Sequence, residues 1–175
     1  MRWVAGHRAD WLSDVAFGVM HVGTTVAGVA VCALVASVFV VRFRIRWAAA
    51  AAVVAFVAAG LLAAGLKHLF DRPRPPADLA LITVGGASFP SAQAAETAAV
   101  AAALLIATTW SSRSLARAAT GAAVIVLVGI GGFMVYLGAH WMTDVLAGWV
   151  LGACCGSGAG WVARRMATRS TAAQA

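Results

Sequence analysis

The sequence predicts an all-α protein, a polytopic transmembrane helix bundle of five spans plus an N-terminal interfacial helix, six helices in all. The first reason is composition: 62% of the 175 residues are hydrophobic, 11% are charged, and the mean hydropathy is +0.89. Soluble domains average about half apolar and about a quarter charged. A soluble domain of this length could not bury so much apolar surface, whereas a bilayer solvates it.

The second reason is the length of the apolar stretches. Five of them can cross a hydrocarbon core of about 30 Å as helices rising about 1.5 Å per residue. Ahead of them, apolar residues from Trp11 to Val19 recur at helical spacing opposite Asp10 and Asp14. This pattern fits an interfacial helix or the extended end of the first span, and the sequence leaves both open. The expected spans are residues 22–41, 47–66, 94–110, 118–137 and 144–162.

The charges between the spans predict one domain, its topology and its location. We expect a single domain over residues 1–170 and a disordered tail at 171–175. When loops alternate sides, one side collects arginines without acids and the other mixes cations with acids. The positive-inside rule makes the acid-free side cytoplasmic, together with the C-terminus, in the plasma (inner) membrane. Because the cations lie in short clusters between spans, we expect no nucleic-acid partner. The cytoplasmic arginines are Arg42, Arg44, Arg46, Arg113, Arg117, Arg164, Arg165 and Arg169.

The last expected span carries a glycine ladder, in which Gly148, Gly152, Gly156 and Gly160 recur every four positions. Such a stripe lets a neighbouring helix approach closely. The neighbour is either another helix of the same bundle or a second copy, in a homodimer through Gly148, Gly152 and Gly156. The cysteines fall in apolar runs and lack metal-ligand spacing. No cluster elsewhere in the sequence would bind a metal, and we expect no metal and no cofactor.

Polar residues concentrate in three short clusters at the ends of expected spans. Residues 67–75 (KHLFDRPRP) end the second span, 88–93 (SFPSAQ) open the third, and 136–144 (YLGAHWMTD) join the fourth to the fifth. Because successive spans alternate in direction, all three clusters reach the same side of the membrane. That side is the outer one, so we expect a single site there.

The chemistry of these clusters suits an oxyanion. Lys67 and Arg74 flank a proline-stiffened turn and can hold a phosphate dianion. Ser91 can cap the following helix, whose free N–H groups then face an anion. His140 and Asp144 stand four residues apart. Asp144 can hold one ring nitrogen and leave the other free to attack phosphorus.

The clusters resemble the three signature motifs of the type-2 phosphatidic acid phosphatase superfamily, K-x6-R-P, P-S-G-H and S-R-x5-H-x3-D. Lys67 with Arg74 fits the first, and His140 with Asp144 fits the second half of the third. The resemblance implies that His140 forms a phosphohistidine and that Asp144 orients it. It also implies that Lys67, Arg74 and Ser91 hold the phosphate, without a metal.

Two positions depart from the family pattern. Gln93 stands where the second motif has its acid histidine, and Met134 stands where the third has its arginine. Gln cannot supply a proton, and Met cannot donate to a phosphate oxygen. Glu96, one helical turn after Gln93, is a candidate replacement acid, and His68 and His21 are further candidates.

We therefore expect a membrane phosphatase-like hydrolase acting on a lipid or prenyl phosphate or diphosphate through His140. Since a departing phosphate is a weak base, activity without the acid should favour diphosphates. The alternative is an inactive family member that binds a phosphorylated lipid through Lys67, Arg74, Ser91 and Gln93.

Overall fold

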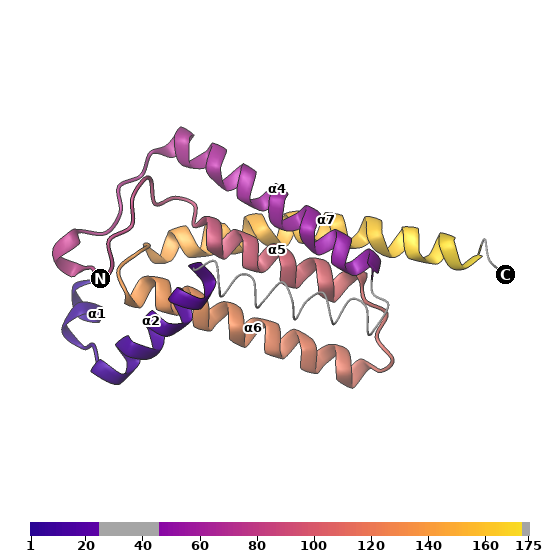
Figure 1. The fold of residues 1–175 in the computed structure, drawn as a ribbon, viewed down its shortest axis with the longest axis horizontal. Helices are drawn as coiled ribbons and strands as arrows, with labels where there is room; N and C mark the ends of the chain where they lie inside the picture. Colours follow the sequence, from indigo (N-terminus) through magenta and orange to yellow (C-terminus); the bar gives the residue numbers. More distant parts are fainter. Residues whose placement is uncertain (25–45, 173–175) are drawn as a thin grey trace.

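The computed structural model describes residues 1–24 and 46–172, and within them the chain forms six α-helices and no strand. Four long helices lie side by side along the long axis, and α1 and α2 lie at the end that carries the N-terminus (Figure 1). The predicted all-α class is confirmed. The helices are α1 Arg2–Gly6, α2 Asp10–Thr24, α4 Arg46–Phe70, α5 Ala92–Ala107, α6 Arg113–Tyr136 and α7 Met142–Ala172, with a 3-10 turn, η1, at Ala77–Leu79.

Three helices are long and apolar enough to cross a membrane: α4, α6 and the part of α7 from Met142 to Ser170. They correspond to the spans expected at 47–66, 118–137 and 144–162. Of the span expected at 22–41, residues 25–41 lie outside the described part of the chain. α7 continues to Ala172, so residues 171 and 172 of the expected tail are helical, and 173–175 lie outside the description.

The stretch expected to span at 94–110 forms α5, which has 16 residues and ends at Ala107. This is shorter than the about 20 residues that a span needs. Thr108 has extended backbone angles and ends the helix. Ser112 then caps α6 by accepting the N–H of Leu115, so α6 begins before residue 118. α5 packs against both α4 and α7, which also contact each other, and it contributes mainly alanines to the core.

Small side chains set the close packing of α4, α5 and α7. On α4 the buried alanines recur every three or four positions, which places them on one helix face. On α7, a side chain at Gly152 would collide with the backbone oxygen of Ala95 in α5, and one at Gly156 with that of Ala99. The glycine ladder therefore packs within the chain, and a homodimer stays a prediction that would need another surface. The alanines of α4 are Ala48, Ala51, Ala55, Ala59 and Ala63.

The N-terminal helices cover the end of the bundle where α6 stops. Arg8 donates to the backbone oxygen of Tyr136 at 2.7 Å and to that of Leu79 at 2.7 Å. The hydroxyl groups of Ser13 and Tyr136 are hydrogen-bonded at 3.0 Å. The helix predicted around Trp11–Val19 is present as α2. The five residues of α1 are too few to show a helical period in the sequence, and α1 was not expected.

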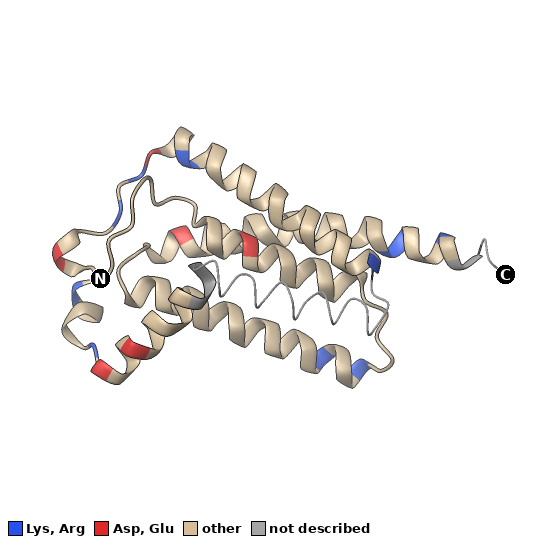
Figure 2. Cartoon of the chain, in the orientation of Figure 1, with Lys and Arg blue, Asp and Glu red and all other residues tan. Residues whose placement is uncertain are grey.

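Charge separates along the bundle. Figure 2 shows blue bands without red ones at the end where α4 and α6 begin and α7 stops. We call this end the basic end. No aspartate or glutamate of the described residues lies there, as the expected sorting of loops requires. Its arginines are Arg46, Arg113, Arg117, Arg164, Arg165 and Arg169.

Candidate active site

Three segments meet at the end of the bundle opposite the basic end. They are the segment that follows α4, the start of α5 with the residues just before it, and the link between α6 and α7. Backbone hydrogen bonds join them. The N–H of Ser88 donates to the oxygen of Arg72 at 2.8 Å, and the N–H of Ser91 donates to that of Asp144 at 3.0 Å. The structure therefore brings the three polar clusters of the sequence together.

His140 and Asp144 are both buried, in the link and in the first turn of α7. Gly138 forms the turn of the link with φ of 81°, a conformation that glycine adopts without strain. Asp144 is the third residue of α7, and its Oδ2 accepts the N–H of Trp141 at 2.9 Å. This reach back to the residue before the helix is half of a capping box and fixes the carboxylate.

The same carboxylate faces the histidine ring. Oδ2 of Asp144 lies 3.5 Å from Nδ1 of His140, beyond good hydrogen-bond geometry. Among the described residues, no other group accepts a hydrogen bond from this nitrogen. Catalytic hydrogen bonds are often long without substrate and tighten when it binds. The pair is therefore placed to form the contact during reaction.

Arg74 determines which nitrogen of His140 carries the proton. Its Nη1 lies 3.3 Å from Nε2 of His140. Since a guanidinium has only donors, Nε2 must be the acceptor, and Nδ1 carries the proton toward Asp144. Burial, and then the charges of Arg74 and Lys67, lower the pKa of His140 to about 4. The ring is therefore neutral near pH 7, with the lone pair of Nε2 toward the cations.

Lys67 and Arg74 converge on one backbone carbonyl. Nζ of Lys67 donates to the oxygen of Ala87 at 2.6 Å, and Nη2 of Arg74 donates to the same oxygen at 3.5 Å. Nη1 of Arg74 also donates to the oxygen of Ala139 at 2.7 Å, next to His140. Two half-buried cations therefore lie beside a neutral imidazole, an arrangement suited to an oxyanion.

Ser91 caps α5 as expected, because its Oγ accepts the N–H of Ala94 at 3.4 Å. The same hydroxyl donates to Sδ of Met134 at 3.5 Å, and both side chains are fully buried. Met134 packs with Ala94, Val135 and Val145 in an apolar cluster. The position that holds an arginine in the family motif is thus closed by an apolar side chain.

The carboxyl group of Glu96 lies beside α4. A Cβ added at Gly60 of α4 would lie 2.7 Å from Oε1 of Glu96, so the carboxyl group packs against that glycine. Gly60 precedes Lys67 by about two helical turns, or about 10 Å. The structure therefore does not place Glu96 beside Lys67 and His140.

The position of the missing acid is half-buried, whereas the two histidines considered as replacements are exposed. Gln93 is half-buried in the first turn of α5, directly beyond the cap of the helix. His68 is exposed near the end of α4, and His21 is exposed in the last turn of α2.

Arg72 is a site residue that sequence reasoning did not single out, although it lies within the polar cluster at residues 67–75. Its Nη1 donates to Oδ1 of Asp144 at 2.7 Å and to Oγ1 of Thr143 at 2.6 Å. Its guanidinium lies over the ring of Trp141, 5.6 Å from the centroid. The R-P-R-P repeat that contains it was the available signal. Arg72 holds the oxygen of Asp144 that does not face the histidine.

A metal ion needs a group of ligand side chains that lie close together. Within the described ranges, no three side chains of His, Cys, Asp or Glu gather as a ligand group. Metal independence stays a prediction.

Comparison with known proteins gives a family and a fold. The model of the PAP2 superfamily matches residues 47–167. A crystal structure of a transmembrane PAP2-type phosphatidylglycerolphosphate phosphatase from Bacillus subtilis is 24% identical, with a TM-score of 0.76 over 96% of this chain and 82% of that chain. LpxE from Aquifex aeolicus is 23% identical, with a TM-score of 0.68 over 90% of each chain. No curated protein matches the sequence.

Proposed function

The chain belongs to the PAP2 superfamily, and from that membership we propose that it is a membrane phosphatase acting on a lipid or prenyl phosphate or diphosphate. One observation carries the proposal: the 3.3 Å contact between Nη1 of Arg74 and Nε2 of His140, with Lys67 on the same side. A cation that touches the nucleophilic nitrogen can hold a phosphate against it. One structure of similar fold is a phosphatidylglycerolphosphate phosphatase, which supports a lipid substrate.

The proposed reaction has two steps. Nε2 of His140 attacks phosphorus, the bond from phosphorus to the leaving oxygen breaks, and that oxygen departs with the electron pair. Water then attacks the phosphohistidine, which releases phosphate and restores the ring. Asp144 stabilises the positive charge that the ring gains, and Lys67 and Arg74 hold the phosphate oxygens.

Gln93 and Met134, the two departures from the family motifs, lead us to propose a preference for diphosphates over monophosphates. Loss of a general acid costs about 10²–10⁴ in rate, and loss of one hydrogen bond to a charged group costs about 1.5–3 kcal/mol. The first cost depends on the leaving group. The alkoxide of a monophosphate is a strong base and needs a proton, whereas the phosphate that leaves a diphosphate is a weak base. With Gln93 in the acid's position, diphosphates should therefore react faster.

Glu96 is our proposed proton donor for the slower monophosphate reaction. Because its carboxyl group lies at the level of Gly60, it would act through water rather than by direct contact. Glu96→Gln should lower phosphate release from a prenyl monophosphate and leave release from the diphosphate unchanged. If the two rates respond equally, or neither changes, Glu96 is not the donor.

A second candidate function is binding without turnover. The residues at positions 134 and 93 favour it, because Met134 cannot hold a phosphate oxygen and Gln93 cannot protonate a leaving group, while Lys67 and Arg74 can still bind the phosphate. The test is phosphate release from purified protein, beside His140→Ala. Release that the variant abolishes identifies an enzyme, and tight binding of the diphosphate without release identifies a receptor.

We also propose that the site faces outward from the plasma (inner) membrane, since the basic end lies opposite to it. Thr83 lies exposed on the site side, and Ser111 lies exposed between α5 and α6. In intact cells, an impermeant thiol reagent should label Thr83→Cys and spare Ser111→Cys. The reverse pattern would mean that the orientation is inverted.

A further inference from the structure

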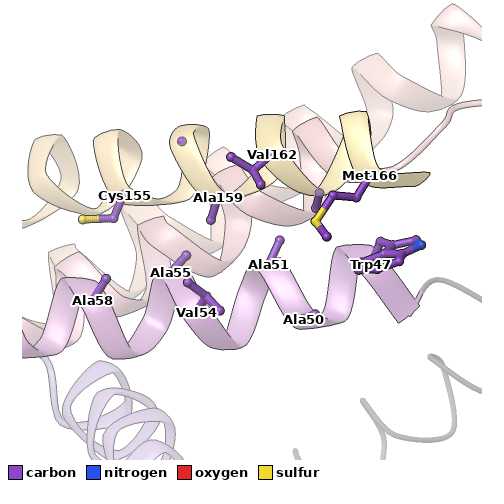
Figure 3. A pocket seen from close by; sticks show the side chains of 12 residues that line it. Trp47, Ala50, Ala51, Val54, Ala55, Ala58, Cys155, Ala159, Val162 and Met166 are labelled. Atoms are coloured by element: carbon purple, nitrogen blue, oxygen red, sulfur yellow. The ribbon is translucent and has the colours of Figure 1, made fainter. Parts of the chain in front are cut away.

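An apolar groove lies between α4 and α7, toward the basic end and away from the candidate active site (Figure 3). Its volume is about 340 Å³. Alanines of both helices form its floor, and larger side chains form its rims. The rim residues are Trp47 and Val54 on α4, and Cys155, Val162 and Met166 on α7.

The groove opens toward the bilayer. Val54 is 61% exposed, Val162 49% and Met166 44%, and all three belong to helices long and apolar enough to cross a membrane. In a membrane these side chains face hydrocarbon rather than water. An elongated apolar hollow in such a surface matches the chemistry of an acyl chain.

Positive charge lies where the groove reaches the basic end. Arg46 directly precedes Trp47, and its guanidinium lies 5.8 Å from the centroid of that ring. Arg165 directly precedes Met166 and lies 4.0 Å from the centroid of the Trp161 ring. Both arginines are exposed, and no salt bridge joins either of them to an acid of the described residues. Two cations without acids beside an apolar groove are complementary to an anion that carries a hydrocarbon chain.

We propose that this groove binds an anionic phospholipid, with an acyl chain between α4 and α7 and the phosphate between Arg46 and Arg165. The inference is independent of the catalytic proposal, because no residue of the groove belongs to the active site. Under the proposed orientation, the lipid belongs to the cytoplasmic leaflet.

The test is lipid retention by purified full-length protein, measured by native mass spectrometry in equimolar phosphatidylglycerol and phosphatidylcholine. Wild type should retain phosphatidylglycerol about tenfold better, as expected for contacts of two arginines with an anionic headgroup. Arg46→Gln combined with Arg165→Gln should remove this preference. Equal retention of both lipids by wild type would overturn the proposal.

A variant that fills the groove distinguishes lipid binding in the groove from general attraction of lipid to the basic end. Gly158 lines the groove, and a Cβ there meets no atom within 4 Å, so the Gly158→Phe side chain starts in open space and its ring can occupy the groove. Gly121→Phe is the matched control, because Gly121 is also open and lies on α6 near Arg117. Gly158→Phe should abolish the retained phosphatidylglycerol, and Gly121→Phe should not.

Two results of this comparison contradict the assignment. Equal retention by the two variants would mean that the basic end attracts lipid without the groove. A wild-type dimer that Gly158→Phe converts to a monomer would mean that a second copy of the chain occupies the groove. The thermal midpoints of both variants should match that of wild type, which shows that each has folded.

Discussion

Nη1 of Arg72 lies 2.7 Å from Oδ1 of Asp144, so a guanidinium holds one oxygen of the carboxylate while the other faces His140. The aspartate is fully buried, and the arginine side chain is 37% exposed. The pair therefore sits at the edge of the site, where the arginine can fix the carboxylate without being buried itself. This relationship gives Arg72 a positioning role in the proposed mechanism.

Replacing Arg72 tests that role. Arg72→Gln removes one charged hydrogen bond to Asp144, so kcat should fall about tenfold. KM should change little, because Arg72 contacts Asp144 rather than the proposed phosphate position. Arg72→Lys should recover part of the loss. Arg113→Gln, at the basic end, is the control. A large rise in KM at unchanged kcat would instead make Arg72 a substrate-binding residue.

Restoring the family histidine tests the substrate preference. Gln93→His supplies a group that can protonate an alkoxide, so release from a prenyl monophosphate should rise by about 10²-fold or more. Release from the diphosphate should rise much less. The measurement is kcat for both substrates with wild type and variant. An equal rise for both would show that residue 93 acts on something other than the leaving group.

The pH dependence tests the environment of His140. Its pKa is lowered from 6.5 to about 4, so the neutral nucleophile persists down to acidic pH. The acid limb of kcat/KM should therefore be set by the histidine only near pH 4. Arg74→Gln removes a positive charge beside the ring, which raises the pKa of His140 and moves the limb to higher pH.

Both proteins should be assayed with the same diphosphate, so that ionisation of the substrate affects the two profiles equally. The variant will also have a lower kcat/KM, since Arg74 is a proposed phosphate ligand. The informative quantity is the midpoint of the acid limb. A midpoint that does not move would contradict the contact between Arg74 and His140.

The packing of α5 against α7 gives a prediction about stability. A side chain at Gly152 would collide with Ala95, so Gly152→Val should destabilise the bundle by about 1–3 kcal/mol. Gly121→Val is the matched control, since it places the same β-branched residue in a helix where space is open. Thermal unfolding in detergent should show a lower midpoint for the first variant only. Equal midpoints would mean that the two helices do not pack this closely.

Much of this architecture follows from local patterns in the sequence. Apolar length predicted α4, α6 and α7, and alternation of direction predicted that residues 67–75, 88–93 and 136–144 would meet. Ser91 was expected to cap a helix because it directly precedes an apolar helical run, and serine is favoured at that position. These inferences depend only on neighbouring residues and on the count of spans.

The sequence could not predict which distant residue each side chain contacts when two residues have the same local surroundings. Arg72 and Arg74 both belong to one R-P-R-P repeat, and only the fold shows that one reaches Asp144 and the other His140. Glu96 shares a helix face with Gln93, yet its carboxyl group packs against Gly60 on another helix. The end of α5 was misplaced because the span was extended to Trp110, whereas the helix ends at Ala107 and Thr108 has extended backbone angles.

The most direct test of the account is phosphate release by purified protein from a prenyl diphosphate and the matching monophosphate, with His140→Ala beside wild type. We predict faster release from the diphosphate, and loss of release from both substrates in the variant. Release that survives in His140→Ala, or a wild type that hydrolyses the monophosphate faster, would contradict it.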